Sequence, residues 1–122
     1  MLGQKILVVD DEPNIVQSLA FVFNREGFDV ATAGDGVQAM SMIRDSKPNP
    51  LILDIMMPNK NGCEVCQEIK SDPELKDIQV LMLSSISNEN SRRHAMSQGA
   101  DDYINKPFSP MQVVTRVKEL LA

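Results

Sequence analysis

Short apolar runs alternate with longer amphipathic segments along the chain. The runs at 6–9, 51–53 and 80–83 are continuous and rich in Val, Ile and Leu, which is typical of parallel strands covered on both faces. At 28–33 larger apolar residues alternate with small or polar ones, so we expect a less covered strand at an edge of the sheet. A brief fifth strand is expected at 103–104.

Five helical segments are predicted between and after these strands, and most have a recognisable beginning. Pro13 suits the first position of the first helix. Three capping patterns open further helices: Asp35 with Gln38, Asn61 with Glu64, and Ser109 with Gln112. A short helix is expected over 90–98. In the second helix, Val37, Met40 and Ile43 continue the helical pattern after the cap.

The alternation of strand and helix, repeated five times, predicts an α/β fold, a doubly wound parallel sheet of five strands with helices on both faces. The 122 residues are enough for one core, and neither a linker nor a repeat divides them. We therefore expect a single domain over residues 1–122. Ligands of such sheets bind outside the carboxyl ends of the strands.

Composition narrows the classes of function. The formal net charge is −5, which argues against direct binding of nucleic acid. No apolar run approaches the roughly 20 residues that span a bilayer, and the N-terminus lacks the layout of a signal peptide. We therefore expect no membrane association and a cytoplasmic location. Two cysteines in a chain of this length do not make a disulfide scaffold.

Carboxylates follow two of the predicted strands. Asp10 and Asp11 end the first strand and Asp54 ends the third, so the three side chains converge if these strands are neighbours. Carboxylates that lie this close together raise one another's pKa unless a cation lies between them. Oxygen ligands with room for water favour Mg²⁺. The sequence thus predicts a magnesium site at this edge of the sheet.

The same edge carries groups suited to phosphoryl transfer. Asp54 can act as a nucleophile, because an aspartyl phosphate is an established type of covalent intermediate. Ser84, at the end of the fourth strand, can donate a hydrogen bond to a phosphoryl oxygen. Lys106, after the fifth strand, can add a positive charge. Each residue alone has a plain structural interpretation, as a cap, a turn residue or a solvated lysine. Their joint placement favours the functional one.

The chain resembles the receiver domain of two-component response regulators, over essentially its whole length. The resemblance rests on Ile-Leu-Val-Val-Asp-Asp-Glu at 6–12, Leu-Asp-Ile-Met-Met-Pro at 53–58, Gly62, and Gly-Ala-Asp-Asp-Tyr-Ile-Asn-Lys-Pro-Phe at 99–108. It implies a flavodoxin-like sheet with strand order 2-1-3-4-5. It also implies a signalling domain rather than an enzyme, one that assists its own phosphorylation and slow dephosphorylation.

The resemblance assigns a role to each residue of the cluster. Asp54 matches the phosphorylated aspartate, and Lys106 and Ser84 match the pair that holds the phosphoryl group. Asp11 and Asp54 match Mg²⁺ ligands, with Asp10 acting through water and the backbone carbonyl of Met56 as a further ligand. Tyr103 matches the aromatic residue that turns inward when Ser84 moves toward the phosphate. The Lys106–Pro107 bond is expected to be cis.

The partners implied are a sensor histidine kinase or a phosphotransfer protein as donor. An output domain or target protein is expected on the surface formed by the helix at 90–98, the strand at 103–104 and the helix after Ser109. A phosphorylation-dependent homodimer is also implied. The resemblance places Met56 and Ile86 at positions that flank access to the phosphoryl group, and both residues are apolar. We therefore expect slow self-hydrolysis, since neither can orient the attacking water.

Two other functions compete with the phosphorylation-activated signalling switch that the resemblance implies. A magnesium-dependent phosphohydrolase with an Asp nucleophile usually has a second acid two residues later, where Met56 stands. A flavin- or nucleotide-binding module would need a glycine-rich loop after the first strand, where the acidic run 10–12 stands instead. Cys63-Glu64-Val65-Cys66 spells the redox motif C-x-x-C, but its helical position favours packing. His94 is expected to face solvent.

Overall fold

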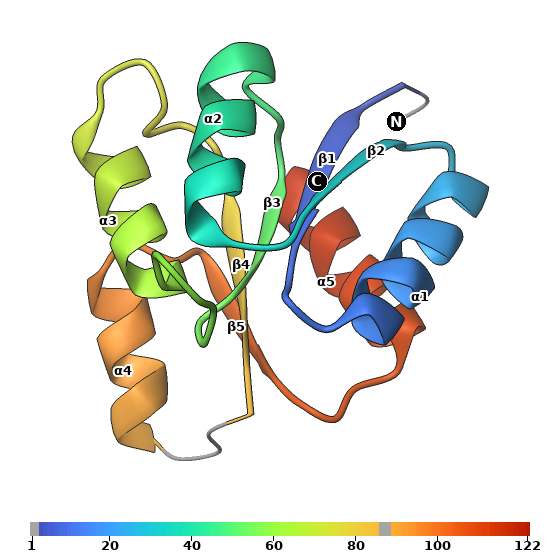
Figure 1. Cartoon of the computed structure of the whole chain (residues 1–122). Helices are drawn as coiled ribbons and strands as arrows, with labels where there is room; N and C mark the ends of the chain where they lie inside the picture. Colours follow the sequence, from blue (N-terminus) through green and yellow to red (C-terminus); the bar gives the residue numbers. More distant parts are fainter. Residues whose placement is uncertain (1–2, 86–88) are drawn as a thin grey trace.

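The computed structural model describes residues 3–85 and 89–122, in which five strands alternate with five helices. The strands are β1 (Lys5–Val9), β2 (Asp29–Ala33), β3 (Leu51–Asp54), β4 (Val80–Ser84) and β5 (Asp102–Asn105). The helices are α1 (Pro13–Arg25), α2 (Gly36–Ser46), α3 (Gly62–Ser71), α4 (Glu89–Ser97) and α5 (Pro110–Leu121). Figure 1 shows the helices packed around a central sheet.

All five strands are parallel, in the order β2-β1-β3-β4-β5, which confirms the predicted topology. β1 and β3 are neighbours, and Val9 pairs with Leu53 at their ends. β4 lies beside β3, with Leu83 opposite Asp54. The residues that end or follow these three strands are therefore brought to one edge of the sheet.

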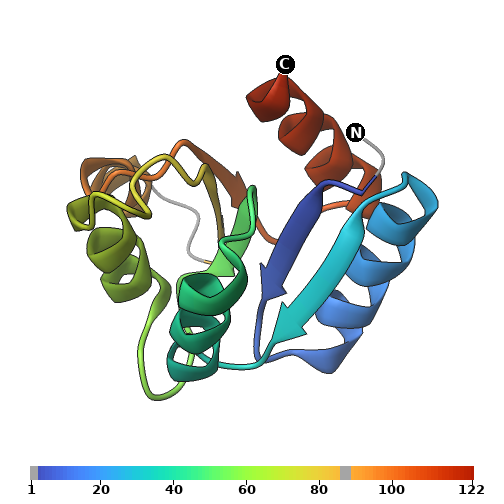
Figure 2. The same ribbon diagram turned by 90° about the horizontal axis from the view of Figure 1, so that it is seen from above.

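The sheet is covered on both faces, as the continuous apolar strands predicted. Helices α1 and α5 lie on one side and α2, α3 and α4 on the other (Figure 2). Successive strand residues point to opposite faces. Ile6 and Val8 accordingly pack with α1 and α5, whereas Leu7 and Val9 pack with the residues of the other three helices. The core thus fixes the register that carries the polar strand ends.

The helix beginnings agree with the capping signals. Asn61 and Ser109 each form a complete capping box, and the Asp35 carboxylate accepts from the backbone N–H of Gln38. The Gln38 side chain accepts from the backbone N–H of Gly34 rather than from that of the cap residue. Helix α4 begins at Glu89, one residue before the predicted start.

Residues Val37, Met40 and Ile43 lie in α2, but they are not all buried. Met40 and Ile43 are buried, but Val37 is 59% exposed. The buried residues of α2 are Gly36, Ala39, Met40 and Ile43. Each residue turns a helix by about 100°, so Val37 lies well to one side of the stripe through Gly36 and Met40. In the described residues, no helix is long and apolar enough to cross a membrane.

Candidate functional site

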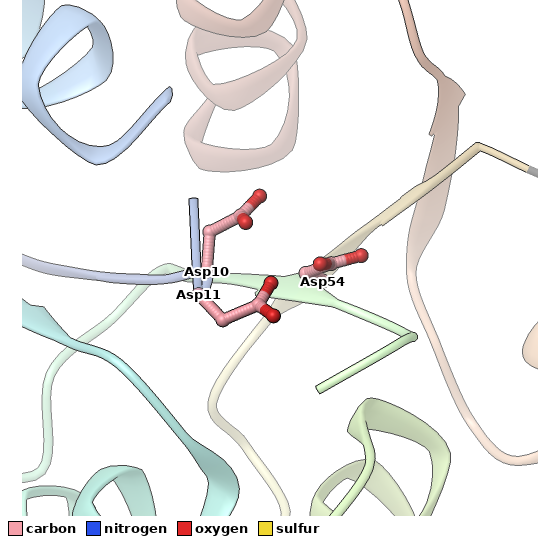
Figure 3. Close-up of side chains that lie close together, drawn as sticks. All are labelled: Asp10, Asp11 and Asp54. Atoms are coloured by element: carbon pink, nitrogen blue, oxygen red, sulfur yellow. The ribbon is translucent and has the colours of Figure 1, made fainter. Parts of the chain in front are cut away.

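Three carboxylates gather where β1 and β3 end. Asp10 directly follows Val9, and Asp54 directly follows that residue's partner Leu53, so the two lie level in the sheet. Asp10, Asp11 and Asp54 each offer an oxygen that lies within 4.8 Å of the others, and Figure 3 shows the three side chains close together. Asp10 and Asp54 are buried, while Asp11 is exposed. The predicted convergence is therefore confirmed.

Lys106 brings a cation into this cluster from the end of β5. Its backbone N–H donates to the carbonyl of Ser84 at 2.7 Å, which extends the pairing of β4 with β5 beyond the strand. Its Nζ lies 2.9 Å from Asp10 Oδ2, 3.0 Å from Glu12 Oε1 and 3.4 Å from Asp54 Oδ2. The Lys106–Pro107 bond is cis, as expected.

Asp10 Oδ2 is a buried oxygen whose demand for a partner is not fully met. Its contact with Lys106 is a close ion pair but lacks the angles of a hydrogen bond, and no other described group donates to it. The other oxygen, Oδ1, accepts from the backbone N–H of Glu12 at 2.9 Å. Buried acceptors without a hydrogen bond are rare. Together with Asp11 and Asp54 this oxygen fits a hard cation such as Mg²⁺.

The charges of the cluster perturb one another. Burial raises the pKa of Asp54 from 3.8 to about 6, and the charge of Asp10 adds to this rise. Lys106 and the backbone N–H of Met56, which donates to Asp54 Oδ1 at 3.3 Å, act in the opposite direction. Burial lowers the pKa of Lys106, but the carboxylates of Asp10, Glu12 and Asp54 outweigh it and hold that pKa above its ordinary value. The lysine is therefore an ammonium ion.

The loop from Ile55 to Asn61 carries Met56 past the cluster. The backbone N–H of Ile55 donates to Leu83 at the start of the loop, and that of Gly62 donates back to Ile55 at 2.9 Å at its end. A Cβ on Gly62 would lie 2.3 Å from the Asp54 carbonyl oxygen, so the loop closes this tightly only with glycine. The Met56 side chain faces solvent and is 58% exposed.

The two predicted switch residues lie on the neighbouring strands. Ser84 ends β4 and is fully buried, one position beyond the residue that pairs with Asp54. Tyr103 lies within the edge strand β5, 6% exposed, in the core beneath α3 and α4. Ile86, expected to flank the site with Met56, lies outside the described residues.

Sequence reasoning missed one residue of the site. Glu12 stands in the acidic run but was assigned no role in the site; it occupies the cap position of α1 and makes no side-chain cap hydrogen bond there. Its carboxylate instead contacts the Lys106 ammonium. The signal available was its place beside two predicted ligands, but only the fold brings residue 106 next to it.

A family model, response regulator receiver domain, matches residues 6–118. The chain belongs to this family. It is 39% identical over 120 residues to the DNA-binding response regulator MtrA of Mycolicibacterium smegmatis. It is 41% identical over 120 residues to the alkaline phosphatase synthesis transcriptional regulatory protein PhoP of Bacillus subtilis. These matches cover 98% of this chain but 51% and 49% of the two relatives, so the chain spans about half the length of the curated proteins it matches.

Solved structures agree with the family. The crystal structure of a putative response regulator from Chloroflexus aurantiacus superposes with a TM-score of 0.92 at 31% identity. The superposition covers 98% of both chains. The chemotaxis response regulator CheY4 of Vibrio cholerae superposes with a TM-score of 0.87 at 27% identity, covering 96% of this chain and 99% of that one. The chain is thus a receiver domain of the two-component response regulators, and the hydrolase reading is not favoured.

The remaining motifs have structural explanations. Cys66 is buried in α3, and burial raises the pKa of its thiol to about 11. Burial also raises the pKa of the half-buried Cys63. Redox cysteines need accessible thiolates, so these two are poorly suited to that chemistry. His94 is exposed, as predicted.

Proposed function

We propose that this receiver domain is a phosphorylation-activated switch, in which Asp54 accepts a phosphoryl group in a Mg²⁺-dependent reaction. The observation that carries the proposal is the pair of buried carboxylates, Asp54 and Asp10, with the Lys106 ammonium in contact with both. Burying two acids side by side is costly unless positive charge compensates them, so the pair favours a site that binds a cation. The donor is a sensor histidine kinase or a phosphotransfer protein.

With a phosphohistidine as donor, an Asp54 carboxylate oxygen attacks phosphorus, an O–P bond forms, and the P–N bond breaks. The imidazole leaves with the bonding electrons and takes up a proton. A pKa near 6 leaves Asp54 mostly ionised at pH 7, as a nucleophile must be. The Lys106 ammonium, 3.4 Å from Asp54 Oδ2, is close enough to bind an oxygen of the transferred group, and the Ser84 hydroxyl would bind another.

A magnesium ion would be held by Asp11, Asp54 and the backbone carbonyl of Met56, with Asp10 acting through water. The exposed Asp11 and the unsatisfied Asp10 Oδ2 support this assignment. When bound, Mg²⁺ supplies positive charge that offsets the repulsion among the carboxylates and the charge on the phosphoryl oxygens. The protein's own residues fix the orientation of Asp54, through Met56 N–H and Lys106.

The donor needs a surface near Asp54, and a cavity of about 490 Å³ is lined by Lys106, the lysine that contacts Asp54. The start of α1 and the β5–α5 loop line the cavity, with Ile15, Phe108 and Pro110 among its apolar residues. An apolar cavity with a few polar groups is the usual form of a binding site. We propose that the phosphodonor docks over it.

The signal leaves through the α4-β5-α5 surface. Phosphorylation draws Ser84 toward the phosphate, and the Tyr103 ring, which is already buried in β5, repacks in response, a two-state change biased by local charge. An output domain, a target protein or a second copy of the chain reads that surface, where Arg116 and Asp102 form an ion pair at 2.8 Å. The net charge of −5 supports the proposal that this segment does not itself contact nucleic acid. The expected location is cytoplasmic.

Phosphorylation is tested with wild-type protein and Asp54→Asn. Each is incubated with a small phosphoryl donor, with Mg²⁺ or with a chelator, and its intact mass is followed over time. We expect a single acid-stable, base-labile phosphoryl group on the wild type, only with Mg²⁺, that persists after the donor is removed. Rapid release of phosphate with no standing adduct would instead support a phosphohydrolase. An equal adduct on Asp54→Asn would refute the assignment.

A further inference from the structure

The β3–α3 loop touches the first turn of α2 at a point with no spare room. A Cβ added to Gly36 would lie 2.0 Å from the carbonyl oxygen of Lys60 and 2.7 Å from its Cβ. Real Cβ atoms do not approach backbone atoms this closely, so the contact exists only because residue 36 is glycine. Any larger residue must push the Lys60 backbone away from α2.

A hydrogen bond between the two preceding residues, Asn59 and Asp35, also holds the β3–α3 loop against α2. Asn59 Nδ2 donates to Asp35 Oδ2 at 3.2 Å, while Asp35 Oδ1 accepts from the backbone N–H of Gln38. One carboxylate therefore caps α2 and holds the loop at once. Asn59 has a φ of +68°, a left-handed conformation that asparagine adopts more readily than most residues.

The β3–α3 loop is short and its backbone is held by its own hydrogen bonds. A shift of the Lys60 backbone must therefore move neighbouring loop residues. The backbone N–H of Lys60 donates to the carbonyl of Pro58 at 2.7 Å, and that of Gly62 donates to Ile55 at 2.9 Å. Met56 lies inside the segment that the Gly62–Ile55 bond closes, and its backbone N–H donates to Asp54. The chain thus connects the α2 contact to the main chain beside the nucleophile within five residues.

We propose that Asp35 and Gly36 are positioning residues for the Asp54 site, acting through the β3–α3 loop on the orientation of the Met56 backbone. They touch neither the proposed metal nor the phosphoryl group. Groups that orient metal ligands from outside commonly change metal affinity by about ten- to hundredfold when altered. This inference rests on the proposed function, because it assigns these residues to the Mg²⁺ affinity and phosphorylation of that site.

The test uses two glycines of the same turn. Gly36→Ala introduces the clash, whereas a Cβ on Gly34 would meet only the Gln38 side chain, at 3.9 Å, among the described residues. Asn59→Gly is the third variant, which removes the hydrogen bond to Asp35 and keeps the left-handed backbone unstrained. Alanine is a better helix former than glycine, so a loss in Gly36→Ala cannot come from the helix propensity of α2.

Mg²⁺ affinity is measured by calorimetry on unphosphorylated protein, and the phosphorylation rate with a small donor is measured at low and at saturating Mg²⁺. For Gly36→Ala we expect Mg²⁺ affinity about ten- to hundredfold lower and a rate that high Mg²⁺ partly restores. Asn59→Gly should lose about two- to tenfold. Gly34→Ala should bind like the wild type. If Gly36→Ala fails to fold, Asn59→Gly against Gly34→Ala still decides.

Two results would overturn the positioning role. One is equal Mg²⁺ affinity in Gly36→Ala, Asn59→Gly and Gly34→Ala. The other is a slower rate that saturating Mg²⁺ leaves unchanged, in protein that unfolds at the wild-type temperature. Failure of the proposed function looks different, because the wild type would then bind Mg²⁺ yet acquire no phosphoryl group, and the affinity comparison would still stand.

Discussion

Removing the charge of Asp54 should stabilise the protein in the absence of metal. Asp54 is 3% exposed and its pKa is raised from 3.8 to about 6, chiefly by burial and then by Asp10. The ionised carboxylate is therefore less favourable in the folded state than in the unfolded state, by about 1.4 kcal/mol for each unit by which the pKa is raised. The full cost at pH 7.5 is therefore about 3 kcal/mol, and water at the open edge of the site reduces it to about 1–2 kcal/mol.

The sign of the pH dependence follows from the same values. Between pH 3.8 and about 6 the folded state binds more protons at Asp54 than the unfolded state does, so the penalty disappears as the pH falls. The advantage of Asp54→Asn should be full above about pH 6 and gone below pH 4. Asparagine keeps an oxygen that can accept from Met56 N–H, and Lys106 keeps two carboxylates, Asp10 and Glu12.

The assay is urea unfolding of wild type and Asp54→Asn in a chelator, at pH 7.5 and at pH 4. Asp45→Asn, which changes an exposed carboxylate of α2, is the matched control and should shift the free energy of unfolding by less than about 0.5 kcal/mol. Mg²⁺ should narrow the difference at pH 7.5 by binding the wild type preferentially. Equal stability at pH 7.5, or an advantage that persists undiminished at pH 4, would refute the repulsion argument.

Three further substitutions probe the site. Lys106→Met should slow phosphoryl acceptance from a small donor by about a hundredfold, as expected for loss of a charge aimed at the transferred group, and an unchanged rate would remove Lys106 from the mechanism. Met56→Asn should shorten the lifetime of the adduct severalfold in a decay assay, because an amide can orient water where the exposed thioether cannot; an equal lifetime would show that water is oriented elsewhere. Glu12→Gln should change the unfolding free energy by less than about 1 kcal/mol, because Glu12 is largely exposed. It should speed phosphoryl acceptance from the same donor, because Lys106 loses its ion pair with Glu12. A slower reaction would show that Glu12 does not compete with the phosphoryl group for Lys106.

The fold was predictable because its signals are local. Continuous apolar runs mark strands covered on both faces. The capping boxes that begin at Asn61 and Ser109 predict the starts of α3 and α5, and the structure confirms them. The exposure of Val37 does not follow from the sequence, because Val37, Met40 and Ile43 all fit the helical period while the buried face of α2 is set by what packs on it.

The site was predictable in its members and less so in its contacts. Residues that end a strand, such as Asp54, or directly follow one, such as Asp10, are placed by the topology alone, so their convergence could be inferred. The contact of Glu12 with Lys106 joins residues 94 positions apart and depends on where a flexible side chain settles. The fit of Gly36 against the Lys60 backbone is likewise a product of helix placement, which no local pattern encodes.

The central claim is that Asp54 carries the phosphoryl group, and residue mapping tests it most directly. Wild-type protein is incubated with Mg²⁺ and a small phosphoryl donor, then reduced with borohydride, which converts an aspartyl phosphate to homoserine, and its peptides are mapped by mass. We predict conversion at Asp54 alone, and none in the sample without Mg²⁺. Conversion at Asp10 or Asp11 instead, or no conversion in protein that binds Mg²⁺, would contradict the account.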